Sequence, residues 1–175
     1  ACEIVGVTLS RYQRRSELND LEHPLLHKVG SLQEACAVAR QFGSRVLLTT
    51  GSKELAAYQQ GLPGKTLLVR VLPTSEVIAE CEALGLGVDN IIALRGPFSA
   101  EFNAATYDFC TPDVVMTKES GAEGGYLDKV TPALARNIPC VVVTRPQPLV
   151  CGPELLESRD DVSRRVTRWL QESKS

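Results

Sequence analysis

The sequence predicts an α/β fold with an open, mainly parallel sheet and helices on both faces. Two observations support this prediction. Short continuous apolar runs, such as residues 46–48 within the expected strand 45–50 and residues 140–143, alternate along the chain with segments that have helical apolar spacing. Strands that are apolar throughout, rather than at alternate positions, are typical of parallel sheets buried on both faces.

The first half of the chain contains three expected strands, at residues 4–7, 45–50 and 66–71. A polar, basic segment at residues 9–15 is expected to form a loop after the first strand. Ser31 and Glu34 have the spacing of a capping box, which predicts the start of a helix that Gly43 closes. A shorter helix is expected up to Gly61, followed by a turn at Pro63 and Gly64.

The second half repeats this alternation, with strands expected at residues 91–94, 114–117 and 140–143. Helices are expected to begin at Thr74 or Ser75, at Ser99 and at the Ser158-x-x-Asp161 pattern, because hydroxyl and carboxylate side chains cap helix N-termini. A glycine-rich loop covers residues 120–125. Pro132 conflicts with the helix predicted at residues 126–137. Either it kinks that helix, or Thr131 caps a second short helix with Pro132 at its first position.

Composition excludes several classes of function. A net charge of -2 with 23% charged residues gives no overall attraction to nucleic acid or anionic membranes. No apolar run approaches the roughly 20 residues of a membrane-spanning helix, and no signal-peptide pattern is present. We therefore expect a cytoplasmic protein. With 175 residues and 43% hydrophobic content, the chain can bury a core of its own.

The six cysteines form no C-x-x-C pair, and no histidine lies at metal-ligand spacing from one of them. Several fall within apolar strand or helix patterns, where free cysteine behaves as a small buried hydrophobe. This favours reduced thiols over a disulfide framework and predicts no metal site. His23 and His27 are interpreted as loop or packing residues, because Pro24 lies between them.

Three strand ends carry residues suited to binding an anion. Each combines glycine with hydroxyls and a cation, and each precedes a helix N-terminus, where backbone N–H groups favour negative charge. In a parallel sheet these carboxyl ends share one edge, which is where ligands bind. The segments are Thr49-Thr50-Gly51-Ser52-Lys53, Arg95-Gly96-Pro97-Phe98-Ser99 and Thr117-Lys118-Glu119-Ser120-Gly121.

Each of these loops, taken alone, also fits an ordinary turn and cap. Their common edge is what favours a binding site. The best-known phosphate motifs are absent, because Gly51-Ser52-Lys53 lacks the spacing of a P-loop and Gly85-Leu86-Gly87 follows a helix rather than a strand. No G-x-S-x-G nucleophile elbow is present either.

The three loops, in this order and spacing, resemble those of precorrin-6A reductases. The resemblance covers about residues 1–146. It lies in the T-T-G-S turn at Thr49, the R-G-P-F turn at Arg95, the T-K-x-S-G loop at Thr117, and the strand from Ile138-Pro139 to Thr144-Arg145-Pro146. Each motif alone is weak, and the ordered set is specific.

The resemblance implies two Rossmann-like domains with a cleft between them. It also implies reduction by NADPH of one double bond of precorrin-6A, or its cobalt-containing counterpart, to the 6B form. The family's first domain carries a glycine-rich turn and a D-A-T-H-P segment, and neither is found here. We therefore expect residues 1–146 to form the C-terminal Rossmann-like domain, with the family's N-terminal domain missing. Residues 147–175 are expected to pack on the same domain as a tail with a terminal helix.

Cofactor-binding roles are assigned by the resemblance to the three loops: Thr50, Gly51, Ser52, Lys53, Arg95, Gly96, Pro97, Phe98, Lys118, Ser120 and Gly121. Lys118 and Arg95 are the expected cations for a 2′-phosphate or pyrophosphate. Arg11, Arg14 and Arg15 correspond to the family's basic segment and are expected to pair with substrate carboxylates, since precorrins are polycarboxylates. A solvated basic loop is the alternative interpretation.

No proton donor stands out; Lys118, Tyr107, Tyr126, water and the missing half are all open. The isolated chain is accordingly expected to fold and to have little or no reductase activity. Two alternatives remain at this point, because fold does not determine function. One is a non-catalytic tetrapyrrole- or nucleotide-binding module. The other is an enzyme of linear tetrapyrroles resembling uroporphyrinogen-III synthase.

Overall fold

The computed structural model describes residues 10–12, 21–119, 126–145, 154–156 and 158–172. The chain divides into two compact units, one formed by Leu18–Pro146 and the other by Ala1–Glu17 together with Gln147–Ser175. Ser120 and Gly121 of the third loop, Arg14 and Arg15, and the strand expected at residues 4–7 lie outside the described residues.

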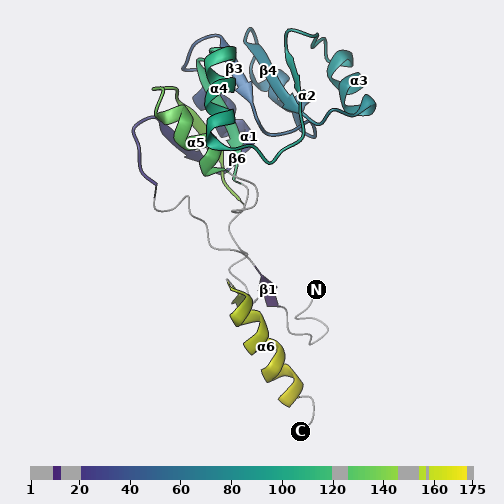
Figure 1. Cartoon of the computed structure of the whole chain (residues 1–175), viewed down its shortest axis with the longest axis vertical. Helices are drawn as coiled ribbons and strands as arrows, with labels where there is room; N and C mark the ends of the chain where they lie inside the picture. The colour runs from purple at the N-terminus through teal and green to yellow at the C-terminus, as the bar shows by residue number, and fades with distance from the viewer. Residues whose placement is uncertain (1–9, 13–20, 120–125, 146–153, 157, 173–175) are drawn as a thin grey trace. The chain divides into compact units, whose positions relative to one another are not determined.

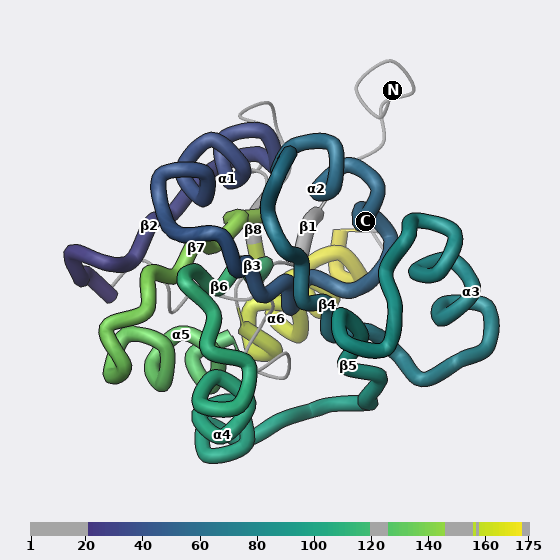
Figure 2. The backbone as a smooth tube through the Cα atoms, turned by 90° about the horizontal axis from the view of Figure 1, so that it is seen from above, coloured from purple at the N-terminus to yellow at the C-terminus, as the bar shows by residue number. Residues whose placement is uncertain are grey.

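The larger unit is built on a six-stranded sheet in which every pairing is parallel. Its strand order is β2-β7-β6-β3-β4-β5, which Figure 2 shows from one side of the unit to the other. This confirms the predicted α/β class. The strands are β2 (Leu26–Val29), β3 (Arg45–Leu48), β4 (Thr66–Val71), β5 (Ile91–Ala93), β6 (Val114–Lys118) and β7 (Cys140–Val143).

Helices cover both faces of this sheet (Figures 1 and 2). On one face lie α1 (Leu32–Ala39), α2 (Leu55–Gly61) and α3 (Ser75–Ala83). On the other face lie α4 (Ala100–Cys110) and α5 (Leu127–Leu134).

Two apolar clusters follow from this arrangement, one on each face of the sheet. Val46 and Leu48 of β3 pack with α1 and α2. Leu47, between them in sequence, packs on the opposite face with Tyr107 of α4 and Val130 of α5. Because successive side chains of a strand point to opposite faces, a continuous apolar strand is what a two-sided core requires.

The expected helix caps are present. Ser31 Oγ accepts a hydrogen bond from the Glu34 backbone N–H at 3.2 Å, and Ser99 Oγ accepts one from Phe102 N–H at 3.3 Å. Thr74, rather than Ser75, caps α3. Glu34 departs from the capping-box pattern, since its Oε2 accepts from the backbone N–H of Gly30 at 2.9 Å instead of that of Ser31.

Two expectations for the larger unit were incomplete or wrong. Strand β2 was not predicted, because His27 and Lys28 interrupt its apolar character. His27 lies in this strand with its ring centroid 5.4 Å from that of Phe42, so its interpretation as a packing residue is confirmed. Helix α5 continues through Pro132 as one helix, so the alternative of a second helix capped by Thr131 is wrong.

The smaller unit contains a two-stranded parallel sheet of β1 (Ser10–Tyr12) and β8 (Glu154–Leu156), and the helix α6 (Arg159–Glu172). The loop expected at residues 9–15 is therefore corrected, because residues 10–12 pair with β8. Strand β8 was not predicted. The Ser158 and Asp161 cap is confirmed by reciprocal hydrogen bonds of 3.0 and 2.9 Å. Packing of residues 147–175 on the larger unit stays a prediction.

Four cysteines, Cys36, Cys81, Cys110 and Cys140, are free and buried, as the apolar patterns predicted. Burial raises the pKa of each of these thiols. In the described ranges no helix is long and apolar enough to cross a membrane. The same ranges contain no group of three or more His, Cys, Asp or Glu side chains arranged to hold a metal ion.

Lys65 generates a prediction about stability. Its ammonium donates to the backbone carbonyls of Arg40, Phe42 and Gly43, at 3.2, 2.7 and 2.8 Å, and so satisfies the C-terminal end of α1. We expect Lys65→Met to lower the free energy of unfolding by about 1–3 kcal/mol, because these carbonyls lose a charged donor. Urea unfolding followed by circular dichroism measures the change.

Lys53→Met is the matched control, since Lys53 is exposed and the described residues offer it no hydrogen bond. It should change the free energy of unfolding by less than about 0.5 kcal/mol. Equal losses for the two variants would show that the Lys65 contacts contribute nothing specific.

Candidate functional site

The strand order reverses between β3 and β6, and this reversal creates the candidate site. From β3 the chain crosses through α2 to β4, on one side of β3, whereas from β6 it crosses through α5 to β7 in the opposite direction. The helices α2 and α5 also lie on opposite faces. Loops that leave adjacent strands in opposite directions leave a crevice at the carboxyl edge, which is where α/β sheets bind ligands.

The first predicted loop follows β3 at this crevice. The Thr49 hydroxyl donates to the backbone carbonyl of Met116 in β6 at 3.2 Å. This hydrogen bond joins the ends of the two strands at the point where the following loops diverge. Thr50 is half-buried beside the phenol of Tyr58. Gly51 has φ of 79°, a left-handed conformation that strains other residues, so glycine is required by the turn.

The third loop meets the first through charge. Lys118, the last residue of β6, forms an ion pair and hydrogen bond with Glu54, which immediately precedes α2. Both side chains are more than one-third exposed, so solvent and salt weaken their attraction. An anion at Lys118 would have to compete with Glu54. Lys118 is therefore a weaker candidate for a phosphate than the sequence alone indicated.

The second loop lies between β5 and α4 and contains a cis peptide bond between Gly96 and Pro97. A Cβ atom on Gly96 would lie 3.1 Å from the Phe98 ring, so the absence of a side chain lets this ring fold back against its own loop. Phe98 also stacks on Phe102 of α4, with ring centroids 4.9 Å apart. Arg95 is exposed at the start of this loop.

Arg70 of β4 is a site residue that the sequence analysis missed. Its side chain is only 6% exposed, and its guanidinium carbon lies 4.3 Å from the centroid of the Phe98 ring. One nitrogen, Nη1, donates to Oδ1 of the fully buried Asn103 at 2.7 Å. The Asn103 amide in turn donates to the carbonyl of Ser99 at 2.9 Å. These contacts connect the β4 strand to the second loop.

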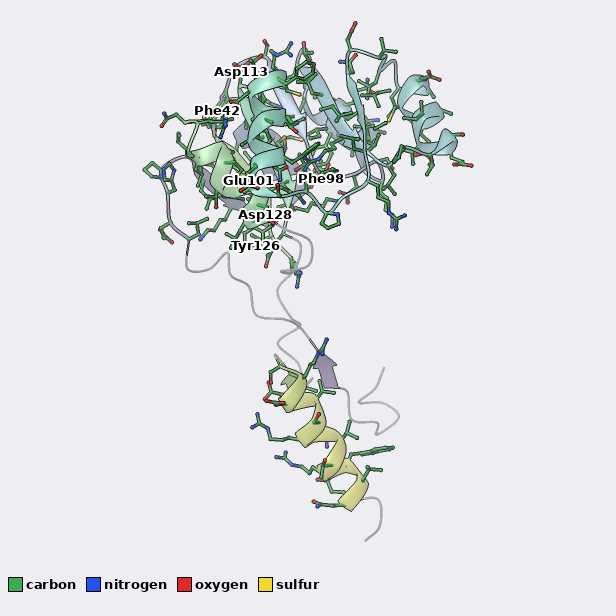
Figure 3. All side chains as sticks on the ribbon, viewed as in Figure 1. Phe42, Phe98, Glu101, Asp113, Tyr126 and Asp128 are labelled. Atoms are coloured by element: carbon green, nitrogen blue, oxygen red, sulfur yellow. The ribbon has the colours of Figure 1, made fainter. Side chains whose placement is uncertain are left out.

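These elements line a pocket of about 330 Å³ at the carboxyl edge. The first and second loops contribute four predicted site residues to its lining: Gly51, Gly96, Pro97 and Phe98. Its other lining residues are Thr49, Arg70, Val71, Leu72, Leu94 and Lys129. In Figure 3, Phe98, Glu101, Tyr126 and Asp128 lie at one end of the sheet unit, and Asp113 and Phe42 lie at its opposite end. This agrees with a single binding edge.

The remaining predicted residues are not all brought into this pocket. Ser52 and Lys53 line a separate groove of about 620 Å³ between α2 and α3, together with Val77 and Glu80. Thr50 and Arg95 lie in the same loops as the pocket residues without lining it, and Lys118 lies in the third loop, which contributes no lining residue among those described. Arg11 lies in β1 of the smaller unit.

Both tyrosines considered as proton donors are buried. The Tyr107 hydroxyl donates to the backbone carbonyl of Lys129 at 2.9 Å, and burial holds its pKa well above the ordinary value. A buried phenol that is engaged in this way is poorly suited to give up a proton near neutral pH. Tyr126 is 2% exposed.

The chain matches known proteins over most of its length. The family model described as "Precorrin-6x reductase CbiJ/CobK" matches residues 1–169. A cobalt-precorrin-6A reductase of Salmonella typhimurium is 59% identical over 174 residues, which cover 99% of this chain and 66% of the relative. A cobalt-precorrin-6A reductase of Methanothermobacter thermautotrophicus is 33% identical, over 98% of this chain and 57% of the relative.

A solved structure titled "CobK precorrin-6A reductase" has the same fold, with a TM-score of 0.75 at 22% sequence identity. The match covers 96% of this chain and 65% of that structure's chain. This chain therefore spans no more than about two thirds of the length of these relatives. On the family match and the relatives' identity, the chain belongs to the precorrin-6x reductase family, CbiJ/CobK.

Proposed function

We propose that this chain forms one wall of the active-site cleft of an NADPH-dependent reductase in cobalamin biosynthesis. Its substrate would be precorrin-6A or cobalt-precorrin-6A, of which one ring double bond is reduced to give the 6B form. The observation that carries the proposal is the pocket at the point where the strand order reverses, in a chain of the precorrin-6x reductase family. The names of two relatives favour the cobalt-containing substrate.

We infer that the carboxyl edge binds a nicotinamide dinucleotide phosphate. Gly51 keeps its turn free of a side chain, and the pocket contains cations with unused hydrogen-bonding capacity. When bound, this cofactor supplies a hydride. The chain would hold its phosphates with backbone N–H groups and cations of the three predicted loops, including Ser52, Lys53, Ser120 and Gly121.

The rest of each relative's length would supply the opposite wall of the cleft. We propose that this part corresponds to the family's N-terminal domain, which would also provide residues for proton delivery. Arg11, Arg14 and Arg15 would bind substrate carboxylates, for which paired N–H groups of arginine are suited. The buried free thiols support our proposal that the protein acts in the reducing cytoplasm.

The direct test joins this chain to the remaining third of the Salmonella relative and follows NADPH oxidation with precorrin-6A and cobalt-precorrin-6A. We expect oxidation by the joined protein and little or none by the 175-residue chain alone, because the chain holds one wall of the cleft. Full activity of the chain alone would overturn the two-wall proposal. Tetrapyrrole binding without NADPH oxidation would favour the binding module or the synthase-like alternative.

Arg95 provides a test of cofactor binding by this chain. We expect Arg95→Gln to weaken NADPH binding about tenfold, as loss of a charge-assisted contact to phosphate predicts. Fluorescence titration with NADPH and NADH measures the change. A loss for NADPH only would place Arg95 at the 2′-phosphate, and a loss for both would place it at the pyrophosphate.

Arg136→Gln is the matched control, because Arg136 pairs with Asp108 near the C-terminal end of α5, away from the carboxyl edge. Its affinity for both nucleotides should equal that of the unmodified chain. If Arg95→Gln and Arg136→Gln behave alike, Arg95 makes no specific contact with the cofactor.

A further inference from the structure

The pocket contains two cations, and none of the ion pairs among the described residues neutralises either of them. Arg70 reaches it from β4 and Lys129 from α5, so two elements far apart in sequence deliver positive charge to one cavity. Neither residue belongs to the three loops that the sequence singled out. Their surroundings indicate what kind of ligand this cavity accepts.

Arg70 uses only part of its hydrogen-bonding capacity. Nη1 bonds to Asn103, and the ring of Phe98 covers the guanidinium face. Nη2 is buried and has no hydrogen-bond partner among the described residues. A buried arginine that served structure alone would be expected to have its donors satisfied, since each unsatisfied charged donor is costly.

Lys129 adds a second positive charge. Its pKa is lowered, first by burial and next by the repulsion from Arg70. In the part of the chain that the structure describes, Lys129 forms no ion pair, and Asp128, its acidic neighbour, is exposed. The pair is therefore electrostatically unfavourable as long as the cavity holds no anion.

Asp128 favours the charge on Lys129 but is exposed, and the other titratable groups that act on these cations do not balance them at neutral pH. Tyr107 and Cys110 of α4 act on Arg70, and Cys140 of β7 acts on Lys129. Burial raises the pKa of all three groups, that of Cys140 to about 12, so each is neutral. Asn103 is neutral by nature. No buried carboxylate is found at the cavity among its lining residues.

We propose that the Arg70–Lys129 pocket is an anion site that binds one carboxylate or phosphate group, with Arg70 Nη2 and the Lys129 ammonium as its donors. Asn103 and Phe98 position Arg70. Asn103 accepts the hydrogen bond from Nη1, and the Phe98 ring packs against the plane of the guanidinium. This leaves Nη2 as the donor for a ligand oxygen. The site does not require the proposed reductase function, which bears only on the natural source of the anion.

The test uses the 175-residue chain and its Lys129→Gln variant, with inorganic phosphate and acetate as probes in isothermal titration calorimetry. We expect saturable binding of at least one probe in the millimolar range and a loss of about tenfold or more in Lys129→Gln. Lys28→Gln, which removes the same charge from the edge strand β2, should bind the probes unchanged. No saturable binding, or equal losses in both variants, would overturn the site.

The stability of Lys129→Gln supplies a second readout. If Lys129 had only a structural role, the variant would be less stable than the unmodified chain, whereas the anion site predicts equal or higher stability without anions. Without anions, Lys129→Gln should unfold at the same or a higher urea concentration than the unmodified chain, because it removes an unbalanced charge. Phosphate should then stabilise the unmodified chain and not the variant. A variant that is less stable without anions, and equally stabilised by phosphate, would contradict the proposal.

A final pair of probes distinguishes the two sources of the anion. NADPH supplies phosphate, and uroporphyrin, a tetrapyrrole with eight carboxylates, supplies carboxylate. Selective loss of NADPH affinity in Lys129→Gln assigns the pocket to a cofactor phosphate. Selective loss of uroporphyrin affinity assigns it to a substrate carboxylate. An effect on inorganic phosphate or acetate with neither larger ligand affected would support the anion site and assign it to neither the cofactor nor a tetrapyrrole carboxylate.

Discussion

The pairing of β3 with β6 is the constraint on which the candidate site depends. These two central strands are parallel neighbours, and the connections that leave them run in opposite directions. The Thr49 hydroxyl bonded to Met116 and the Lys118 pair with Glu54 hold the ends of the two strands together. Because the helices that follow lie on opposite faces, neither covers the crevice between them. The anion binding that we propose at this edge would follow from the topology first and from individual side chains second.

Much of the architecture could be predicted from the sequence, because strands buried on both faces are apolar at every position. The runs at residues 46–48 and 114–116 are of this kind, and both lie in central strands. Strand β2 escaped prediction because an edge strand has one unpaired side, where polar residues such as Lys28 are tolerated. Strands β1 and β8 are three residues each, too short for any periodicity to be recognised.

The candidate site was predicted in part. Gly51 and Phe98 could be placed at one edge because carboxyl ends of parallel strands coincide. Arg70 did give a signal, a charge inside an otherwise apolar strand, which indicates a buried cation with a specific partner. Lys129 gave none, since a lysine on an amphipathic helix is ordinarily solvated. Its position against Arg70 depends on how α4 and α5 pack, which is a tertiary fact with no local pattern in the sequence.

Hydrogen–deuterium exchange of the 175-residue chain with and without NADPH tests the central claim most directly, namely that ligands bind at the carboxyl edge. The account predicts slower exchange at residues 49–53 and 95–99, which follow β3 and β5. It also predicts unchanged exchange at the opposite edge, at residues 40–44 and 111–113. Protection confined to that opposite edge, or no protection at saturating NADPH, would contradict it.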